Sequence, residues 1–343
     1  MKAFALLAAL ATVVCACTDA ADPIRPTFSL SPDLSAPSMW VTRASMPTAR
    51  FGLAVGVVDS TLYALGGRTA GGPVGTLEAY DPATDTWMTK APMPTARYSL
   101  AAGVVNGVVY AVGGRTSDGT IVGTVEAYDP VSDSWTTKAP MPTARFGLAV
   151  GVVNGILYAV GGARSGPTPG HPSPILETVE AYDPTTDTWT TKHSMGWRRY
   201  YLAAGVVNGI LYAVGGSSGG DFLKLVEAYD PASDTWTVQA PQATSRSQLA
   251  VGVVSSTLYA VGGSPTGTAG RSFEAYDQGT NTWTAQDSMP TGRASLAVGV
   301  VNGVLYAVGG SGESGTVEAY GPAVGPCSVR GAPGRPRYGC ARI

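Results

Sequence analysis

The repeating unit of this chain is clearest at residues 140–162, PMPTARFGLAVGVVNGILYAVGG, and at residues 177–192, ETVEAYDPTTDTWTTK. GLAVGVV is a continuous run of small apolar residues, as expected for a strand buried on both faces. The pair Asn154-Gly155 that follows is the strongest short hairpin signal, and ILYAV is a second strand that ends in a glycine pair. TVEAY and TWTTK are predicted as the third and fourth strands, with an Asp-Pro turn after TVEAY.

The unit occurs six times. Its glycine pairs are Gly66-Gly67, Gly113-Gly114, Gly161-Gly162, Gly215-Gly216, Gly262-Gly263 and Gly309-Gly310, so the steps are 47, 48, 54, 47 and 47 residues. Tryptophans recur with the same spacing at Trp40, Trp87, Trp135, Trp189, Trp236 and Trp283. Tyrosines do the same at Tyr80, Tyr128, Tyr182, Tyr229, Tyr276 and Tyr320. Four short strands at this period predict the blades of a β-propeller.

The two ends of the repeat array complement each other. Trp40 has no preceding glycine pair, and Tyr320 has no following tryptophan. We therefore expect the segment near Trp40 to supply the fourth strand of the last blade, which joins the chain ends and removes a free sheet edge. The predicted fold is all-β: a six-bladed β-propeller of four-stranded antiparallel blades, closed by this N-terminal strand.

The copies resemble kelch repeats in their glycine pair, their Tyr-Asp-Pro and their tryptophan, at about the kelch period. The resemblance covers residues 38–323 and implies the propeller fold of the galactose oxidase type.

Composition excludes several classes of protein. Hydrophobic residues make up 44% and charged residues 13% of the chain, with 45 glycines and 25 prolines. A disordered chain is poor in apolar residues, and a helical bundle is poor in glycine and proline. The net charge of −2 disfavours a sequence-independent grip on nucleic acid, which needs a basic field.

The N-terminus is predicted to be a targeting segment. In residues 1–17, Lys2 precedes an apolar run of signal-peptide length. The run ends in a sequence that resembles a bacterial lipoprotein cleavage box with Cys17 as the lipidated residue. Lipidation at Cys15 and plain export with cleavage near Ala20 are the alternatives. We expect an exported protein on the periplasmic or cell-surface side of a bacterial membrane, in contact with that membrane only through its lipid anchor.

Two segments flank the predicted propeller. Residues 18–37 contain four prolines and indicate a flexible tether. Residues 324–343 form a basic tail rich in glycine and proline, with Cys327 and Cys340. In an exported protein these cysteines are candidates for a disulfide, and two idle thiols are the alternative.

Strand alternation places the variable loops on one face. The loops between strands 2 and 3 and from strand 4 to the next strand 1 share that face, and loops on a rigid scaffold usually carry function. Residues present in all six copies are predicted to be structural. These are the tryptophans, the tyrosines, the arginine at the start of each blade and a glutamate on each third strand, as a partner for that arginine. The alternative for the arginines is attraction of anions at the channel mouth.

The largest departure from the repeat lies at the start of blade 4. Trp197 and Arg198 replace small residues there, next to Arg199, and Tyr201 replaces glycine or serine. The preceding blade carries an insertion at 163–176 that includes His171. Aromatic and arginine side chains are frequent interface anchors, so these five residues are candidates for a binding notch between blades 3 and 4. Packing of the tryptophan under the insertion is the alternative.

Arg68 and Arg115 directly follow their glycine pairs. In kelch domains of ubiquitin-ligase adaptors an arginine at this position helps to grip acidic peptides, and the resemblance implies such a role here. The other four copies have alanine or serine.

The sequence supports an enzyme less well than a binding protein. The chain has only two histidines, His171 and His193, so we expect neither a metal nor another cofactor. Exported bacterial kelch proteins include sialic-acid mutarotases, for which Asp118, Asp221 and Glu313 are the candidate acid/base groups. The sequence therefore predicts a non-catalytic module that binds a protein or peptide. The alternative is a carbohydrate-binding or mutarotase-like protein that holds a glycan or another acidic small molecule with loop-face arginines.

Overall fold

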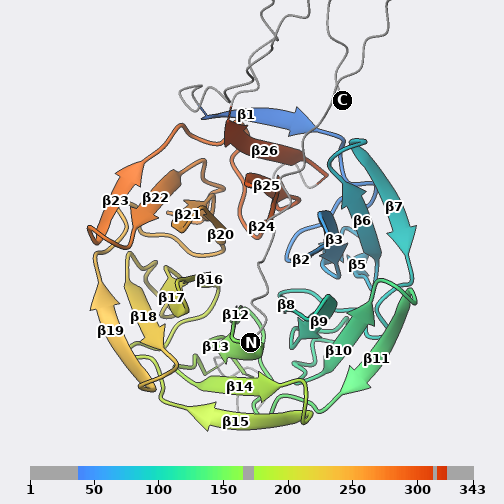
Figure 1. Ribbon diagram of the computed structural model, residues 1–343, viewed down its shortest axis with the longest axis horizontal. Coiled ribbons are helices and arrows are strands. Elements are labelled where there is room, and N and C mark those ends of the chain that lie inside the picture. Colours follow the sequence, from blue (N-terminus) through green and yellow to red (C-terminus); the bar gives the residue numbers. More distant parts are fainter. Residues whose placement is uncertain (1–37, 165–173, 312–314, 323–343) are drawn as a thin grey trace, which may run out of the picture. The chain divides into compact units, whose positions relative to one another are not determined.

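The computed structural model describes residues 38–164, 174–311 and 315–322. These residues form six four-stranded antiparallel sheets around a central axis (Figure 1), which confirms the predicted all-β, six-bladed propeller. The predicted targeting segment with Cys17, the tether, His171, Glu313, and the tail with Cys327 and Cys340 lie outside the described residues. Within the described ranges no helix is long and apolar enough to span a bilayer.

Each blade contributes one strand to each of four concentric positions. The innermost strands are β2 (Ala54–Val58), β8 (Ala101–Val105), β12 (Ala149–Val153), β16 (Ala203–Val207), β20 (Ala250–Val254) and β24 (Ala297–Val301). The second strands are β3 (Thr61–Leu65), β9 (Val108–Val112), β13 (Ile156–Val160), β17 (Ile210–Val214), β21 (Thr257–Val261) and β25 (Val304–Val308). The third strands are β6 (Leu77–Asp81), β10 (Val125–Asp129), β14 (Val179–Asp183), β18 (Val226–Asp230), β22 (Phe273–Asp277) and β26 (Val317–Pro322). The outer strands are β7 (Thr86–Lys90), β11 (Ser134–Lys138), β15 (Thr188–Lys192), β19 (Thr235–Gln239), β23 (Thr282–Ala285) and β1 (Ser38–Arg43). A two-stranded ribbon, β4 (Arg68–Thr69) and β5 (Gly72–Pro73), lies in the loop between β3 and β6.

The ring closes as the sequence predicts. Strand β1 pairs antiparallel with β26, with Trp40 opposite Tyr320, so the last blade takes its outer strand from the start of the array. In Figure 1 the blue β1 lies beside the dark red β26. The blade therefore joins residues that are 280 positions apart in the chain.

The tryptophan and tyrosine rows hold neighbouring blades together. In blade 3, Trp189 Nε1 donates to the carbonyl of Ala139, which follows the outer strand of blade 2, at 3.0 Å. The amide of the same alanine donates to Asp187 Oδ1 at 2.8 Å, and the Tyr182 hydroxyl donates to that oxygen at 2.6 Å. One blade thus grips both backbone groups of a residue in the preceding blade, so the predicted packing role of these rows is confirmed.

This clamp predicts a pH dependence of stability. The hydrogen bonds from Tyr182 and Ala139 lower the pKa of Asp187. Because the folded-state pKa lies below that of the unfolded chain, its contribution to stability is complete above about pH 4 and is lost as the pH falls through the folded-state pKa. Asn281 makes the same two contacts in blade 5 without a charge. We expect Asp187→Asn to be less stable than wild type at pH 6, with a difference that shrinks toward pH 2.5 in urea titrations. A difference that stays constant with pH would refute this role.

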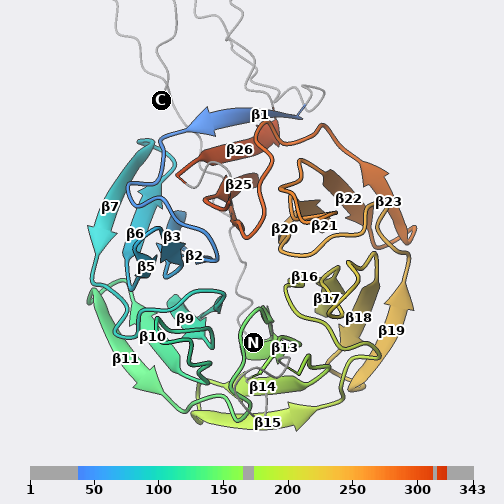
Figure 2. The same cartoon turned by 180° about the vertical axis from the view of Figure 1, so that it is seen from behind.

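Strand alternation sorts the connections onto two faces (Figures 1 and 2). One face carries the short turns between strands 1 and 2 and between strands 3 and 4. The other, which we call the loop face, carries the longer loops between strands 2 and 3 and the loops that lead from one blade to the next. Backbone hydrogen bonds tie these two sets of loops together, such as Gly67 N–H to Arg97 O at 2.9 Å.

Candidate functional site

Six buried ion pairs hold loops of the loop face against the strands of their blades. Each joins the arginine at the start of a blade to a glutamate on the third strand, with N–O distances between 2.5 and 3.1 Å. The pairs are Arg50–Glu78, Arg97–Glu126, Arg145–Glu180, Arg199–Glu227, Arg246–Glu274 and Arg293–Glu318. All six arginine side chains are 0% exposed. The predicted structural role is therefore confirmed, and the alternative of anion attraction at the channel mouth is wrong.

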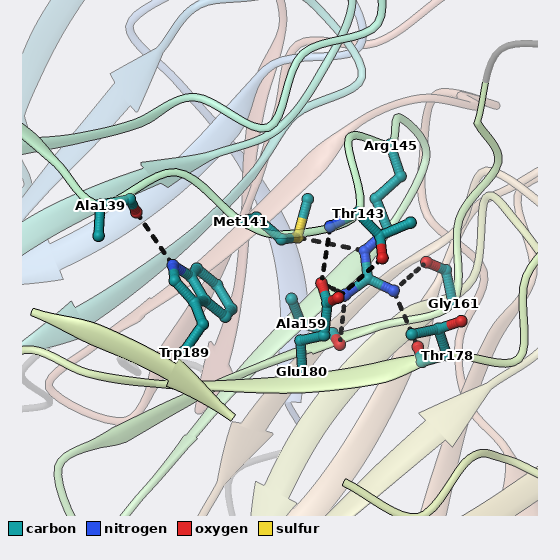
Figure 3. Close-up of polar contacts among 9 residues, drawn as sticks. All are labelled: Ala139, Met141, Thr143, Arg145, Ala159, Gly161, Thr178, Glu180 and Trp189. Carbon is teal, nitrogen blue, oxygen red and sulfur yellow. Dashed lines mark hydrogen bonds and ion pairs between the residues drawn. The ribbon is translucent and has the colours of Figure 1, made fainter. Parts of the chain in front are cut away.

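Figure 3 shows the ion pair and the hydrogen bonds of one of these arginines, Arg145. Arg145 donates to Glu180 at 2.9 Å, and the Thr143 hydroxyl donates to the same carboxylate at 2.7 Å. The other acceptors of the guanidinium are Met141 Sδ and the carbonyls of Ala159, Gly161 and Thr178. Burial lowers the pKa of Arg145 to about 10, which leaves it charged at neutral pH. The pair fixes the loop that begins blade 3 against two strands of that blade.

One residue from each blade joins a closed ring of backbone hydrogen bonds. In each blade this residue stands two positions after the buried arginine, and its N–H donates to the carbonyl of the equivalent residue in the preceding blade at 2.6–2.8 Å. The ring residues are Gly52, Ser99, Gly147, Tyr201, Gln248 and Ser295. All six have positive φ angles between 51° and 62°, although only two are glycine. Every N–H and every C=O in the ring is therefore occupied by a neighbouring blade.

The ring residues line a cavity on the axis. The cavity opens to solvent and has a volume of ≈ 160 Å³, which is smaller than the usual pocket for a whole small-molecule ligand. The rest of its lining comes from leucine, alanine and valine residues at the start of the inner strands. Tyr201 is the sole ionisable residue among the described residues that line it. We call this cavity the channel mouth.

Arg68 and Arg115 lie outside the channel mouth, each over an aromatic ring of the next loop. The Arg68 guanidinium is 5.3 Å from the centre of the Tyr98 ring, and that of Arg115 is 5.8 Å from the centre of the Phe146 ring. Such cation–π contacts orient a guanidinium without neutralising it. Arg115 also donates from Nε to the carbonyl of Gly119 at 3.2 Å. Neither arginine forms a salt bridge with a described acidic residue, so both charges remain available on the loop face.

Tyr201 belongs to the hydrogen-bonded ring, and its side chain also contacts the aromatic rings of Phe146 and Tyr200. Its φ of 52° is costly for a bulky residue. A Cβ atom added to Gly147 would lie 3.0 Å from the Tyr201 ring, so the side chain lies over that glycine. Its ring centre is 5.8 Å from that of Phe146 and 4.7 Å from that of Tyr200. Burial raises the pKa of Tyr201, opposed by a hydrogen bond with Ser99.

The predicted notch at the start of blade 4 is only partly accessible. Trp197 is 59% exposed and Arg198 is exposed, so both are open to a partner. Arg199 is fully buried and paired with Glu227, because it is the structural arginine of its blade. Its assignment as a binding residue is therefore wrong. The amide of Gly196 donates to the same glutamate at 2.9 Å, where most other blades use a threonine hydroxyl.

Sequence reasoning missed the aromatic residues that stand directly before four of the ring positions. The residue directly after each buried arginine is aromatic in blades 1 to 4 and small in blades 5 and 6. The four aromatic residues are Phe51, Tyr98, Phe146 and Tyr200. This asymmetry is visible in the sequence of the repeats and could have identified these residues. The positions of the Arg68 and Arg115 guanidinium groups, over aromatic rings of the following blade, could not be predicted from the sequence.

Asp118 is a poor candidate for a general acid or base. Hydrogen bonds from Thr116 and Thr120 lower the pKa of Asp118 to about 2, far from the near-neutral value that suits a general acid or base. In the described part of the chain, no three His, Cys, Asp or Glu side chains gather in a group that could hold a metal ion.

Comparisons with known proteins agree with this architecture. The profile of the Attractin/LZTR1 beta-propeller family matches residues 38–264, and the Kelch motif matches residues 245–290. No curated protein matches the sequence. Among solved structures, that of YjhT is similar, with a TM-score of 0.69 and 17% identity, over 80% of this chain and 95% of that chain. At this identity the likeness shows the fold alone.

Proposed function

The chain belongs to the Attractin/LZTR1 beta-propeller family, and from this premise we propose that it is a non-catalytic binding module whose loop face engages an acidic segment of a protein or peptide. The kelch propeller itself supports a general binding role. The observation that carries the finer proposal is the pair of unneutralised guanidinium groups on Tyr98 and Phe146, beside the channel mouth.

Charge on the opposite face supports the same choice of partner. The described turns between strands 1 and 2 and between strands 3 and 4 contain aspartates and neither lysine nor arginine. One aspartate follows an inner strand and five end third strands, and each of the six is partly or fully exposed: Asp59, Asp81, Asp129, Asp183, Asp230 and Asp277. An acidic segment is therefore repelled from the face that carries these turns and attracted to the loop face.

A display library of random peptides, selected on the purified chain, tests this proposal. We expect enrichment of Asp and Glu, and at least a tenfold loss of affinity for a selected peptide in the Arg68→Ala, Arg115→Ala double variant. A charge-assisted contact contributes about 1.5–3 kcal/mol, and 1.4 kcal/mol corresponds to a factor of ten. Raising the salt concentration should also weaken binding.

The matched control is the Lys90→Ala, Lys138→Ala double variant. It also removes two positive charges, but from outer strands, away from the channel mouth. We expect its affinity to stay within about a factor of two of wild type, as for surface charges outside an interface. Selection of peptides without acidic residues, or equal losses in both double variants, would rule out the proposed site.

A further inference from the structure

We infer that the acidic partner also places one uncharged aromatic or apolar side chain in the channel mouth, against the ring of Tyr201. This inference rests on the proposed function and divides the ligand into two parts: carboxylates on the arginines outside, and an apolar group on the axis.

The channel mouth is unsuited to an anion because its backbone donors are occupied. Backbone N–H groups that converge on one point bind anions when they are free. Here the six ring N–H groups all donate to ring carbonyls at 2.6–2.8 Å. A carboxylate in the mouth would find none of these donors available.

The side chains of the mouth lead to the same conclusion. Its described lining contains no Lys, Arg, His, Asp or Glu, and its polar side chains, Ser99, Tyr201, Gln248 and Ser295, are uncharged. The six structural arginines below are fully buried and neutralised by their glutamates. Transfer of an unpaired charge into such surroundings is costly, whereas an apolar group gains from leaving water. The leucine, alanine and valine residues of the wall provide partners for such a group.

Tyr201 supplies a fixed aromatic surface at this point. No other blade has an aromatic residue at the ring position, where the equivalents are Gly, Ser or Gln. Its positive φ persists because the ring hydrogen bond to Gly147 at 2.6 Å and the contacts with Phe146 and Tyr200 hold it in place. Strained residues that the surroundings hold in place often occur at binding sites. A rigid aromatic ring next to a cavity is a typical anchor for a partner side chain.

The two parts of the site adjoin each other through Phe146. The centre of its ring lies 5.8 Å from the Arg115 guanidinium carbon and 5.8 Å from the centre of the Tyr201 ring. A single short segment can therefore place a carboxylate on the arginine and a neighbouring apolar side chain in the mouth. We expect the apolar residue within a few positions of the acidic one.

The experiment repeats the peptide selection on wild type and on Tyr201→Gly. Glycine suits the positive φ and occupies the ring position in two other blades, so we expect the variant to fold with an unchanged circular dichroism spectrum. Tyr201→Phe is the matched control, because it keeps the aromatic surface and removes only the hydroxyl. With wild type and Tyr201→Phe we expect one aromatic or large apolar position beside the acidic residues. With Tyr201→Gly we expect that position to become random while the acidic residues persist.

A selected wild-type peptide then gives the quantitative test. Replacing its apolar residue with serine should weaken binding to wild type at least tenfold and binding to Tyr201→Gly less than threefold. Acidic enrichment without an apolar position, or an equal loss in both proteins, would overturn this inference and leave the proposed function standing. Absence of acidic enrichment would overturn the proposed function and this inference with it.

Discussion

Glu180→Ala is expected to lower the free energy of unfolding by about 3–5 kcal/mol, the range for removing one member of a buried ion pair. Its partner Arg145 is 0% exposed, and because a guanidinium stays protonated in proteins, its charge would remain buried without a counter-ion. The carbonyls of Gly161 and Thr178 would still accept from the guanidinium, but they cannot neutralise it. The Thr143 hydroxyl would also lose its acceptor.

Unfolding in guanidinium chloride, followed by tryptophan fluorescence, measures this change in the free energy of unfolding. Glu177→Ala is the matched control, because Glu177 is exposed and only three residues away; we expect a change within about 0.5 kcal/mol. Glu180→Gln keeps the shape of the side chain, and its loss should fall between the two. If Glu180→Ala fails to fold, the glutamine variant still ranks the pair against the control. Similar stability of Glu180→Ala and Glu177→Ala would mean that the pair contributes nothing.

The repeats made the fold and this ion pair predictable. An arginine and a glutamate that recur in all six copies, as Arg145 and Glu180 do, indicate a structural pair. Unpaired ends of the array, at Trp40 and Tyr320, indicate closure. Both arguments need only the order of residues along the chain. The same reasoning should have removed Arg199 from the binding candidates, since it is one of the six recurring arginines.

The channel mouth could not be predicted in the same way. Its ring requires positive φ at Ser99, Tyr201 and Gln248, and none of these residue types signals that conformation as glycine does. The ring forms because six loops from separate blades meet on the axis, where each backbone satisfies its neighbour. Likewise, the contact of Arg115 with Phe146 joins two loops of different blades. These features depend on the arrangement of the blades in space rather than on local sequence.

Gly151→Ala is expected to destabilise the protein by about 1–3 kcal/mol through overpacking between blades 3 and 4. An added Cβ would lie 2.6 Å from Leu211 Cδ1 and 3.2 Å from Val206 Cγ2, both in the next blade. The φ of Gly151 is not positive, so the cost is steric rather than conformational. Equivalent glycines occupy the centre of every inner strand. This indicates that neighbouring blades pack too closely around the propeller axis to admit a methyl group there.

Gly220→Ala makes the same substitution where an added Cβ meets nothing within 4 Å and φ is not positive. We expect it to be neutral or to stabilise by up to about 1 kcal/mol, because alanine restricts the unfolded chain. A double-mutant cycle of Gly151→Ala with Leu211→Ala then identifies the contact. Truncation of the leucine leaves a cavity that the new methyl group partly fills, so the two losses should sum to more than the loss in the double variant. Additive losses would place the strain of Gly151→Ala elsewhere in the blade, and blade spacing would then not be set by this contact.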